Sequence, residues 1–162
     1  MDLLKFKTYL DTEAFDDIPL SDYGFEKPED IILEGYTKIA KTIIQVGDTV
    51  TDNVTKPVGQ RIELVPLKHP YKTKKGGNMD IQVLHLGSPL PDQSIVVSWE
   101  PGAFEDSMDQ LKVYKSDEKG VISFPIKKSG TWWANTIFIE PALNEEDLDF
   151  VSLWGSLTFE IN

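Results

Sequence analysis

The feature that most constrains the fold is a series of short strand-like segments between residues 41 and 162. The segments are rich in β-branched and aromatic residues, several alternate polar with apolar side chains, and turn-forming residues separate them. No helical pattern lies between them, which disfavours a parallel α/β sheet. We therefore expect a mainly β fold, an antiparallel β-sandwich of the immunoglobulin or transthyretin type with about seven or eight strands. The candidate strands are residues 42–46, 61–67, 80–86, 94–99, 111–114, 121–126, 131–139 and 156–161.

The first 40 residues follow a helical pattern instead. Apolar residues recur at helical spacing from Leu3 to Phe15, and Pro19 ends the pattern because proline disfavours helix in the residue before it. A second helix is expected over residues 29–40, with Pro28 in its first turn and acidic residues near its N-terminus. The sequence thus predicts a helical extension or connector over residues 1–40 and a β-sandwich domain over residues 41–162.

The composition excludes several classes of function. The chain has 16 Lys and Arg against 27 Asp and Glu, a formal net charge of −11, whereas nucleic-acid partners require concentrated positive charge. With no Cys, it has no disulfide, no thiolate metal site and no Cys nucleophile. No stretch approaches the ~20 apolar residues that span a bilayer. Residues 1–6 lack the features of a secretory signal, so a cytoplasmic protein or part of an exported one is expected.

Nothing in the sequence selects an active site. A G-x-S-x-G motif is absent, and Lys74–Asn78 lacks the spacing and the following helix of a phosphate-binding loop. We therefore expect a protein that is not an enzyme. For transition metals, imidazole is the side chain to consider, and the chain has two histidines, His69 and His85. Their separation of 16 positions matches no local ligand motif, so they could meet only across a hairpin.

Aromatic side chains offer a different kind of binding site. The chain has four Trp, and the adjacent pair Trp132 and Trp133 must point to opposite faces of a strand. One of the pair is expected in the core, and the other is exposed or covered by a loop. An exposed Trp on a sandwich face can stack on a sugar or fill a pocket of a partner protein.

Several segments, taken in order, resemble a known family. They carry a tyrosine, an alanine–lysine pair and a valine–glycine pair, then a proline–tyrosine stretch, a hairpin and a glycine–tryptophan turn. Together they resemble the C-terminal half of the nickel- and cobalt-uptake-associated (NikM-like) family of exported bacterial proteins, formally a domain of unknown function. The segments are residues 34–47, 57–71, 83–90, 116–133 and 157–159.

The resemblance implies a non-catalytic accessory or binding domain in the periplasm or cell envelope. It also implies a link to nickel or cobalt uptake, with a metal-uptake transporter or another envelope protein as partner. His69 and His85 would then be the candidate ligands of a nickel or cobalt ion. The alternative that the residues themselves suggest is a carbohydrate- or protein-binding β-sandwich module with no metal role.

Overall fold

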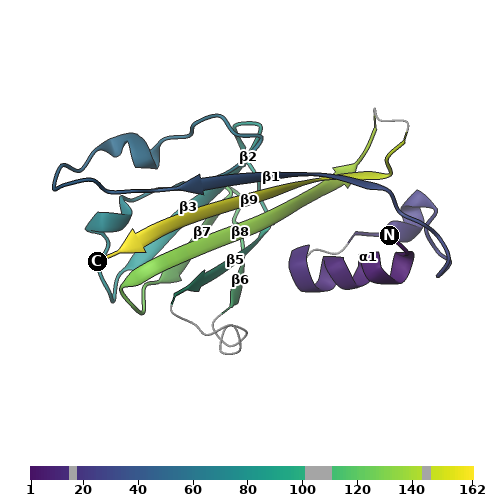
Figure 1. The fold of residues 1–162 in the computed structure, drawn as a ribbon, viewed down its shortest axis with the longest axis horizontal. Coiled ribbons are helices and arrows are strands. Elements are labelled where there is room, and N and C mark those ends of the chain that lie inside the picture. Colours follow the sequence, from purple (N-terminus) through teal and green to yellow (C-terminus); the bar gives the residue numbers. More distant parts are fainter. Residues whose placement is uncertain (15–17, 101–110, 144–146) are drawn as a thin grey trace.

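Most of the structure consists of two β-sheets that pack face to face (Figure 1). It is a computed structural model that describes residues 1–14, 18–100, 111–143 and 147–162. Within these residues nine strands are present, so the expected mainly β sandwich fold is confirmed. The first sheet has five strands, in the order β1 (Glu34–Thr42), β9 (Phe150–Ile161), β8 (Gly130–Pro141), β5 (Ser94–Trp99) and β6 (Lys112–Lys115).

The second sheet is built around one central strand. β3 pairs with β2 along one edge, and β4 and β7 follow one another along its other edge, all antiparallel. These strands lie close to the positions that the turn residues and alternation predict, apart from the two-residue β4. The sheet consists of β2 (Ile62–Pro66), β3 (Asn78–His85), β4 (Ser88–Pro89) and β7 (Val121–Pro125).

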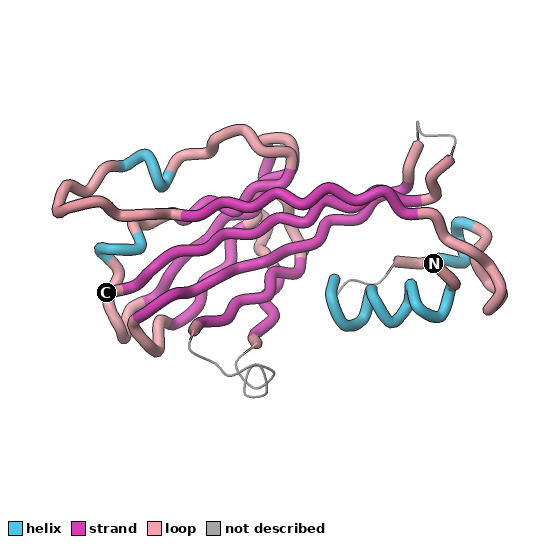
Figure 2. Tube along the Cα trace, viewed as in Figure 1, coloured by secondary structure: helices cyan, strands magenta, loops and turns pink. Residues whose placement is uncertain are grey.

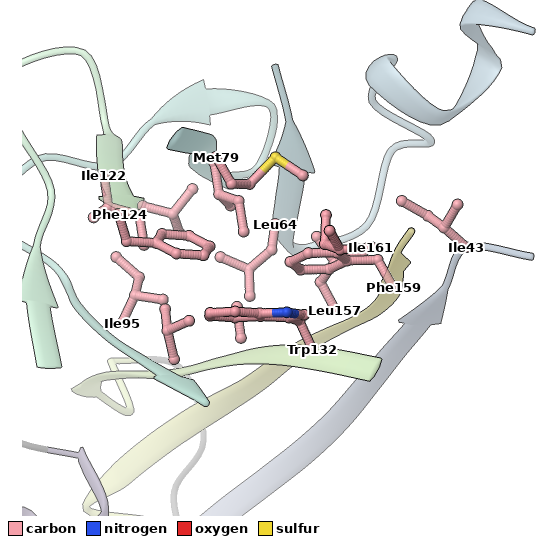
Figure 3. Packing of buried hydrophobic residues seen from close by; sticks show 14 of the residues in the cluster. Ile43, Leu64, Met79, Ile95, Ile122, Phe124, Trp132, Leu157, Phe159 and Ile161 are labelled. Atoms are coloured by element: carbon pink, nitrogen blue, oxygen red, sulfur yellow. The ribbon is translucent and has the colours of Figure 1, made fainter. Parts of the chain in front are cut away.

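The core fills the space between the two sheets. Trp132 is 2% exposed, and its ring stacks on Phe124 with a centroid distance of 5.8 Å. Figure 3 shows Trp132 among Leu157, Phe159 and other apolar side chains contributed by both sheets. Trp133 points the other way, which confirms that the adjacent Trp residues divide between the two faces of β8.

The N-terminal helix covers one end of the outer face of the five-stranded sheet (Figure 2). α1 (Leu3–Tyr9) begins after Asp2, whose side chain accepts the Lys5 N–H, and continues as the π-helical segment η1 (Leu10–Ala14). The buried Phe6 ring stacks on Phe150 of β9 at 5.5 Å. The predicted N-terminal helix is therefore confirmed as far as residue 14. The described residues also form three short 3₁₀ helices: η2 (Leu20–Tyr23), η3 (Asp52–Thr55) and η4 (Pro70–Lys72).

The helix predicted over residues 29–40 is wrong, because β1 occupies residues 34–42. β1 pairs in parallel with β9, from Glu34 opposite Phe150 to Thr42 opposite Thr158. Nine consecutive residues thus find backbone partners in the sheet, and this tertiary pairing outweighs the short helical pattern. Residues 43–46, predicted as a strand, lie beyond its end, and this one parallel pair departs from the expected antiparallel arrangement. The division of the chain at residue 40 into two domains stays a prediction.

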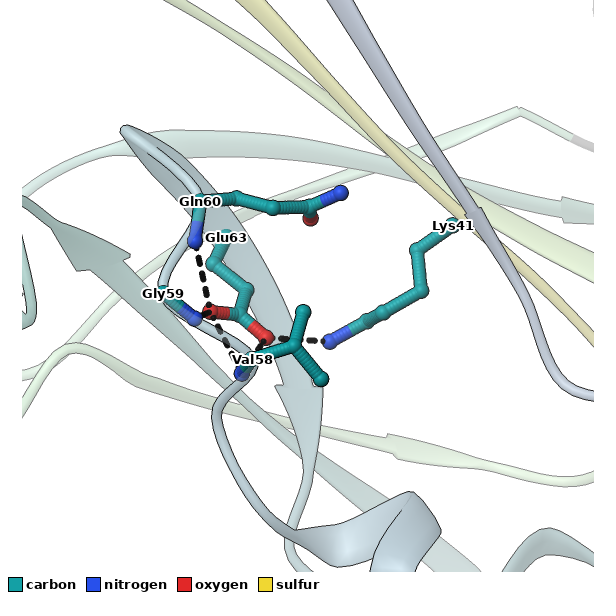
Figure 4. Close-up of polar contacts among 5 residues, drawn as sticks. All are labelled: Lys41, Val58, Gly59, Gln60 and Glu63. Carbon is teal, nitrogen blue, oxygen red and sulfur yellow. Dashed lines mark hydrogen bonds and ion pairs between the residues drawn. The ribbon is translucent and has the colours of Figure 1, made fainter.

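A buried carboxylate lies in β2, where every residue is buried. Glu63 is 1% exposed and accepts hydrogen bonds from the backbone N–H groups of the preceding loop, and Figure 4 shows the loop closing around it. Lys41 of β1 reaches the same carboxylate from the other sheet. The donors of the loop are Val58 N, Gly59 N and Gln60 N, at 2.8, 3.0 and 3.3 Å respectively.

Candidate functional site

A groove of about 560 Å³ lies on the outer face of the five-stranded sheet, beside the end of the N-terminal helix. Its size and mostly apolar lining, with a few polar groups, are typical of small-molecule sites. We call it the outer groove. Its main side chains come from η1 (Thr12 and Glu13), β1 (Lys38 and Ala40), β9 (Trp154 and Ser156), β8 (Trp133, Asn135 and Ile137) and β5 (Val96).

Strand register places these side chains together. Lys38 lies opposite Trp154, and Trp154 lies opposite Ile137, so one row crosses three strands. In the next row Ser156 of β9 lies opposite Asn135 of β8. Because side chains two residues apart share a face, the rows form one continuous outer surface.

Trp154 forms one boundary of the outer groove, and its ring already has partners. The Tyr9 ring is nearly parallel to it, at 5.9 Å and 8°, and the Lys38 ammonium lies 4.5 Å from its centroid. The Tyr9 hydroxyl donates to the Glu34 carboxylate at 3.2 Å. Burial, together with the negative charge of Glu34, raises the pKa of Tyr9, so this donor keeps its proton. Trp154 thus joins the helix to the sheet.

Trp133 has a different environment. It is half-buried in the outer groove, and among the described residues no aromatic ring or cation contacts its ring. The rings of Trp132, Trp99 and Trp154 all have such contacts. Among the described residues, Trp133 is therefore the indole whose ring is not already engaged by another ring or a cation.

The polar groups around Trp133 are suited to hydrogen bonding with a neutral ligand. Asn135 is exposed and offers an amide donor and acceptor, and the hydroxyls of Ser156 and Thr12 can do both. Glu13 and Lys38 add one charge of each sign among the described lining residues. This arrangement can hold a ligand by stacking and hydrogen bonding.

His69 has a structural environment at the start of η4. Its Nδ1 accepts the Tyr71 N–H at 3.2 Å, and its carbonyl accepts the Thr73 hydroxyl at 3.3 Å. Burial and the nearby Lys72 lower its pKa, and the negative charge of Asp52 opposes them in part. Nδ1 is thus unprotonated and already engaged, which leaves Nε2 as the nitrogen that could bind a metal.

His85 lies at the opposite end of β3. Its ring packs on Phe138 at 4.3 Å, and its buried Nε2 has no hydrogen-bond partner in the part of the chain that the structure describes. Leu67, two residues before His69, hydrogen-bonds to Asp80, so roughly 20 Å of strand separates the two histidines.

The structure therefore does not bring the two histidines together in one site. Among the described residues, no group of three or more His, Asp or Glu side chains could hold a metal ion. The metal role of each histidine stays a prediction.

The adjacent Trp132 and Trp133 predict one outward-facing indole without indicating which, and the sequence pattern does not indicate the other side chains of the outer groove. Lys38 lies in β1, within the residues predicted as a helix, so its place on the sheet was not expected. Trp154 lies in the part of β9 that precedes the predicted strand. A signal for the longer β9 is present: Leu153, Leu157, Phe159 and Ile161 occupy alternate positions and face the core.

Fold and groove together define a β-sandwich with an aromatic-lined groove on the outer face of one sheet. The chain belongs to the family described as "Domain of unknown function (DUF4198)", whose sequence model matches residues 4–140. A comparison with curated proteins finds no significant match. In the described residues, no helix has the length and apolar character needed to cross a membrane.

Proposed function

We propose that this chain is a non-catalytic carbohydrate-binding domain whose ligand lies in the outer groove and stacks on Trp133. The observation that carries the proposal is the state of the Trp133 ring. It is half-buried in a groove of about 560 Å³, and none of the described aromatic rings or cations contacts it.

Sugars have the chemistry that this surface matches. The C–H groups on one face of a pyranose are apolar and pack flat on an indole, while the hydroxyls at its edge need donors and acceptors. Asn135 lies two residues from Trp133 on the same face of β8, and Ser156 lies opposite Asn135. A ring stacked on Trp133 would therefore have an amide and a hydroxyl beside its edge.

The mixed charge of the groove favours a neutral sugar. Glu13 and Lys38 both line the groove, and the Lys38 ammonium lies over the Trp154 indole. Carboxylates accept hydrogen bonds from sugar hydroxyls, and an ammonium donates to them. Both groups can thus contact an uncharged saccharide without the cost of desolvating an unpaired charge on the ligand.

The link to nickel or cobalt uptake rests on the resemblance of the ordered segments. The outer groove contains no histidine among its described lining residues, so it adds no support to a metal role. The location in the periplasm or envelope and the transporter partner likewise stay predictions.

The experiment is a glycan array followed by calorimetric titration of the best saccharide. We expect Trp133→Ala to weaken binding at least tenfold, because an aromatic platform contributes roughly 1 kcal/mol or more beyond its buried area. Asn135→Ala should weaken it less. Tyr36→Ala is the matched control, since Tyr36 is a 66% exposed aromatic on the neighbouring β1 and does not line the outer groove.

Two results would contradict the proposal. One is an array on which no saccharide binds the folded chain. The other is a saccharide whose affinity is unchanged by Trp133→Ala, because its site would then lie elsewhere on the molecule.

A further inference from the structure

Five lysines gather at the end of the sandwich that lies opposite α1. Lys74 and Lys75 precede a turn whose Gly76 N–H donates to Ile126 O at 2.8 Å, and Ile126 N–H donates back to Gly77 O at 2.8 Å. These two bonds hold the turn against the segment that continues into Lys127 and Lys128. We call the group the lysine end; it consists of Lys72, Lys74, Lys75, Lys127 and Lys128, all of them exposed.

The charges of the lysine end are not neutralised by ion pairs within the described residues. The lysines that form ion pairs in the described residues are Lys5, Lys41 and Lys68, none of which belongs to the lysine end. Described carboxylates at this end are Glu100, Glu160, which accepts the Tyr71 hydroxyl at 3.0 Å, and Asp52, whose charge acts on His69 beside η4. Asp80 is paired with Lys68. Among the described residues, five unpaired ammonium groups against these three carboxylates leave a local excess of positive charge in a chain whose net charge is −11.

The opposite end of the molecule is acidic. β8 and β9 run from Gly130 and Ile161 at the lysine end to Pro141 and Phe150, where Phe6 of α1 packs. Strands of 12 residues span about 40 Å, several times the Debye length of about 8 Å at physiological ionic strength. A surface at the lysine end is thus screened from the acids beside α1. Those acids are Asp11, Glu13, Asp22, Glu26, Glu29 and Asp30.

We propose that the lysine end docks on an anionic lipid surface. The lysines lie in η4 and in the loops at the ends of β3 and β7, so a flat array of phosphates can meet several of them at once. Clusters of four to eight basic residues bind acidic lipid headgroups in this way. Single-stranded nucleic acid is held differently, in a basic groove with aromatic rings on which bases stack. Among the aromatic rings nearby, Trp99 lies beneath Lys128 and packs against Trp132 in a tilted arrangement, with ring centroids 5.0 Å apart.

The charge separation also sets the orientation of the bound protein. With the lysine end against the headgroups, the acidic end beside α1 points away from the membrane. This docking is independent of the sugar-binding function proposed above.

The test is co-sedimentation of the full chain with vesicles. Vesicles of phosphatidylcholine with about 30% phosphatidylglycerol should bind the protein at low ionic strength, and about 1 M salt should release it. Pure phosphatidylcholine vesicles should not bind it. Each lysine near such a surface contributes a factor of roughly five to six in affinity. Each of the double variants Lys127→Gln/Lys128→Gln and Lys74→Gln/Lys75→Gln should therefore weaken binding about thirtyfold.

The matched control is Lys7→Gln/Lys27→Gln, which changes net charge equally but alters two exposed lysines at the acidic end. Its affinity for the vesicles should stay within about twofold of the wild type. Absence of binding to anionic vesicles overturns the proposal, and so does an equal loss in the control. Tighter binding to a DNA oligonucleotide than to the vesicles at the same ionic strength would also overturn it.

Discussion

The Lys41 ammonium lies 2.7 Å from Oε1 of Glu63, and this pair joins β1 of one sheet to β2 of the other. The side chains of Lys41 and Glu63 are 14% and 1% exposed, so the interaction is largely shielded from water. Burial raises the pKa of Glu63, but the hydrogen bonds from Lys41 and the Val58 N–H outweigh it, and the pKa falls below its usual value. The carboxylate is therefore charged at neutral pH, and its ion pair with Lys41 connects β1 of one sheet to β2 of the other.

Glu63→Gln should lower the free energy of unfolding by about 3 kcal/mol, measured by urea denaturation. The amide keeps the shape of the side chain but leaves the Lys41 charge without its partner, and its NH₂ group cannot accept the loop N–H bonds. Asp80→Asn is the matched control. Its pair with Lys68, at 2.6 Å, is more exposed and should contribute less than about 1 kcal/mol. Equal losses in the two variants would contradict this account.

His69 should make stability depend on pH. Its pKa in the folded protein lies below 6.5, so the unfolded chain binds a proton first as the pH falls. The free energy of unfolding should therefore decrease as the pH falls from about 6.5 to 5.5. His69→Asn supplies an oxygen that can accept the Tyr71 N–H and does not titrate. In this variant the loss over that range should be smaller; an unchanged slope would show that another group is responsible.

Gly120 should tolerate alanine much less well than Gly87. Both have positive φ, +71° and +80°, but a Cβ on Gly120 would lie 2.7 Å from Val83 O and 2.9 Å from Leu90 N. These are backbone atoms of the adjacent strand and hairpin, so they cannot move aside. Thermal or urea unfolding should show a loss of about 1 kcal/mol for Gly87→Ala and about 3 kcal/mol or more for Gly120→Ala. Similar values would contradict the close packing described for Gly120.

Phe6→Ala should weaken the attachment of α1 to the sheet. Phe6 is fully buried and stacks on Phe150, so its truncation should cost about 3–5 kcal/mol of local stability. Amide hydrogen exchange should then be faster throughout residues 3–9 and little changed in β3. Leu4→Ala, at a position 70% exposed on the same helix, is the control and should leave exchange unaltered. Uniform acceleration in both sheets would contradict a local role.

The strands of the sandwich could be predicted because their signals are local. β5 occupies the predicted residues 94–99, since a β-branched run lies there between two turns. β1 could not be found in this way. Its backbone partner is β9, and Phe150 lies 116 positions after Glu34 in the sequence, so the residues around β1 carry no sign of this pairing.

The candidate site likewise has one part that local sequence predicts and another that depends on tertiary packing. The alternation at Trp132 and Trp133 predicts that one indole faces outward, because that follows from the period of a single strand. The contacts of Trp154 with Tyr9 and Lys38 depend on the docking of α1 and the register of β1 against β9. The lysine end likewise requires two turns about 50 residues apart to meet at Ile126.

The most direct test of the central claim is an NMR titration that follows the four indole N–H signals, assigned by single Trp→Phe variants. The saccharide selected on the array should shift the Trp133 signal strongly and saturably. The signals of Trp99 and Trp132 should move little, because their rings pack within the protein. A bound saccharide that leaves the Trp133 signal in place, or shifts another indole more, would contradict the assignment of the outer groove as the binding site.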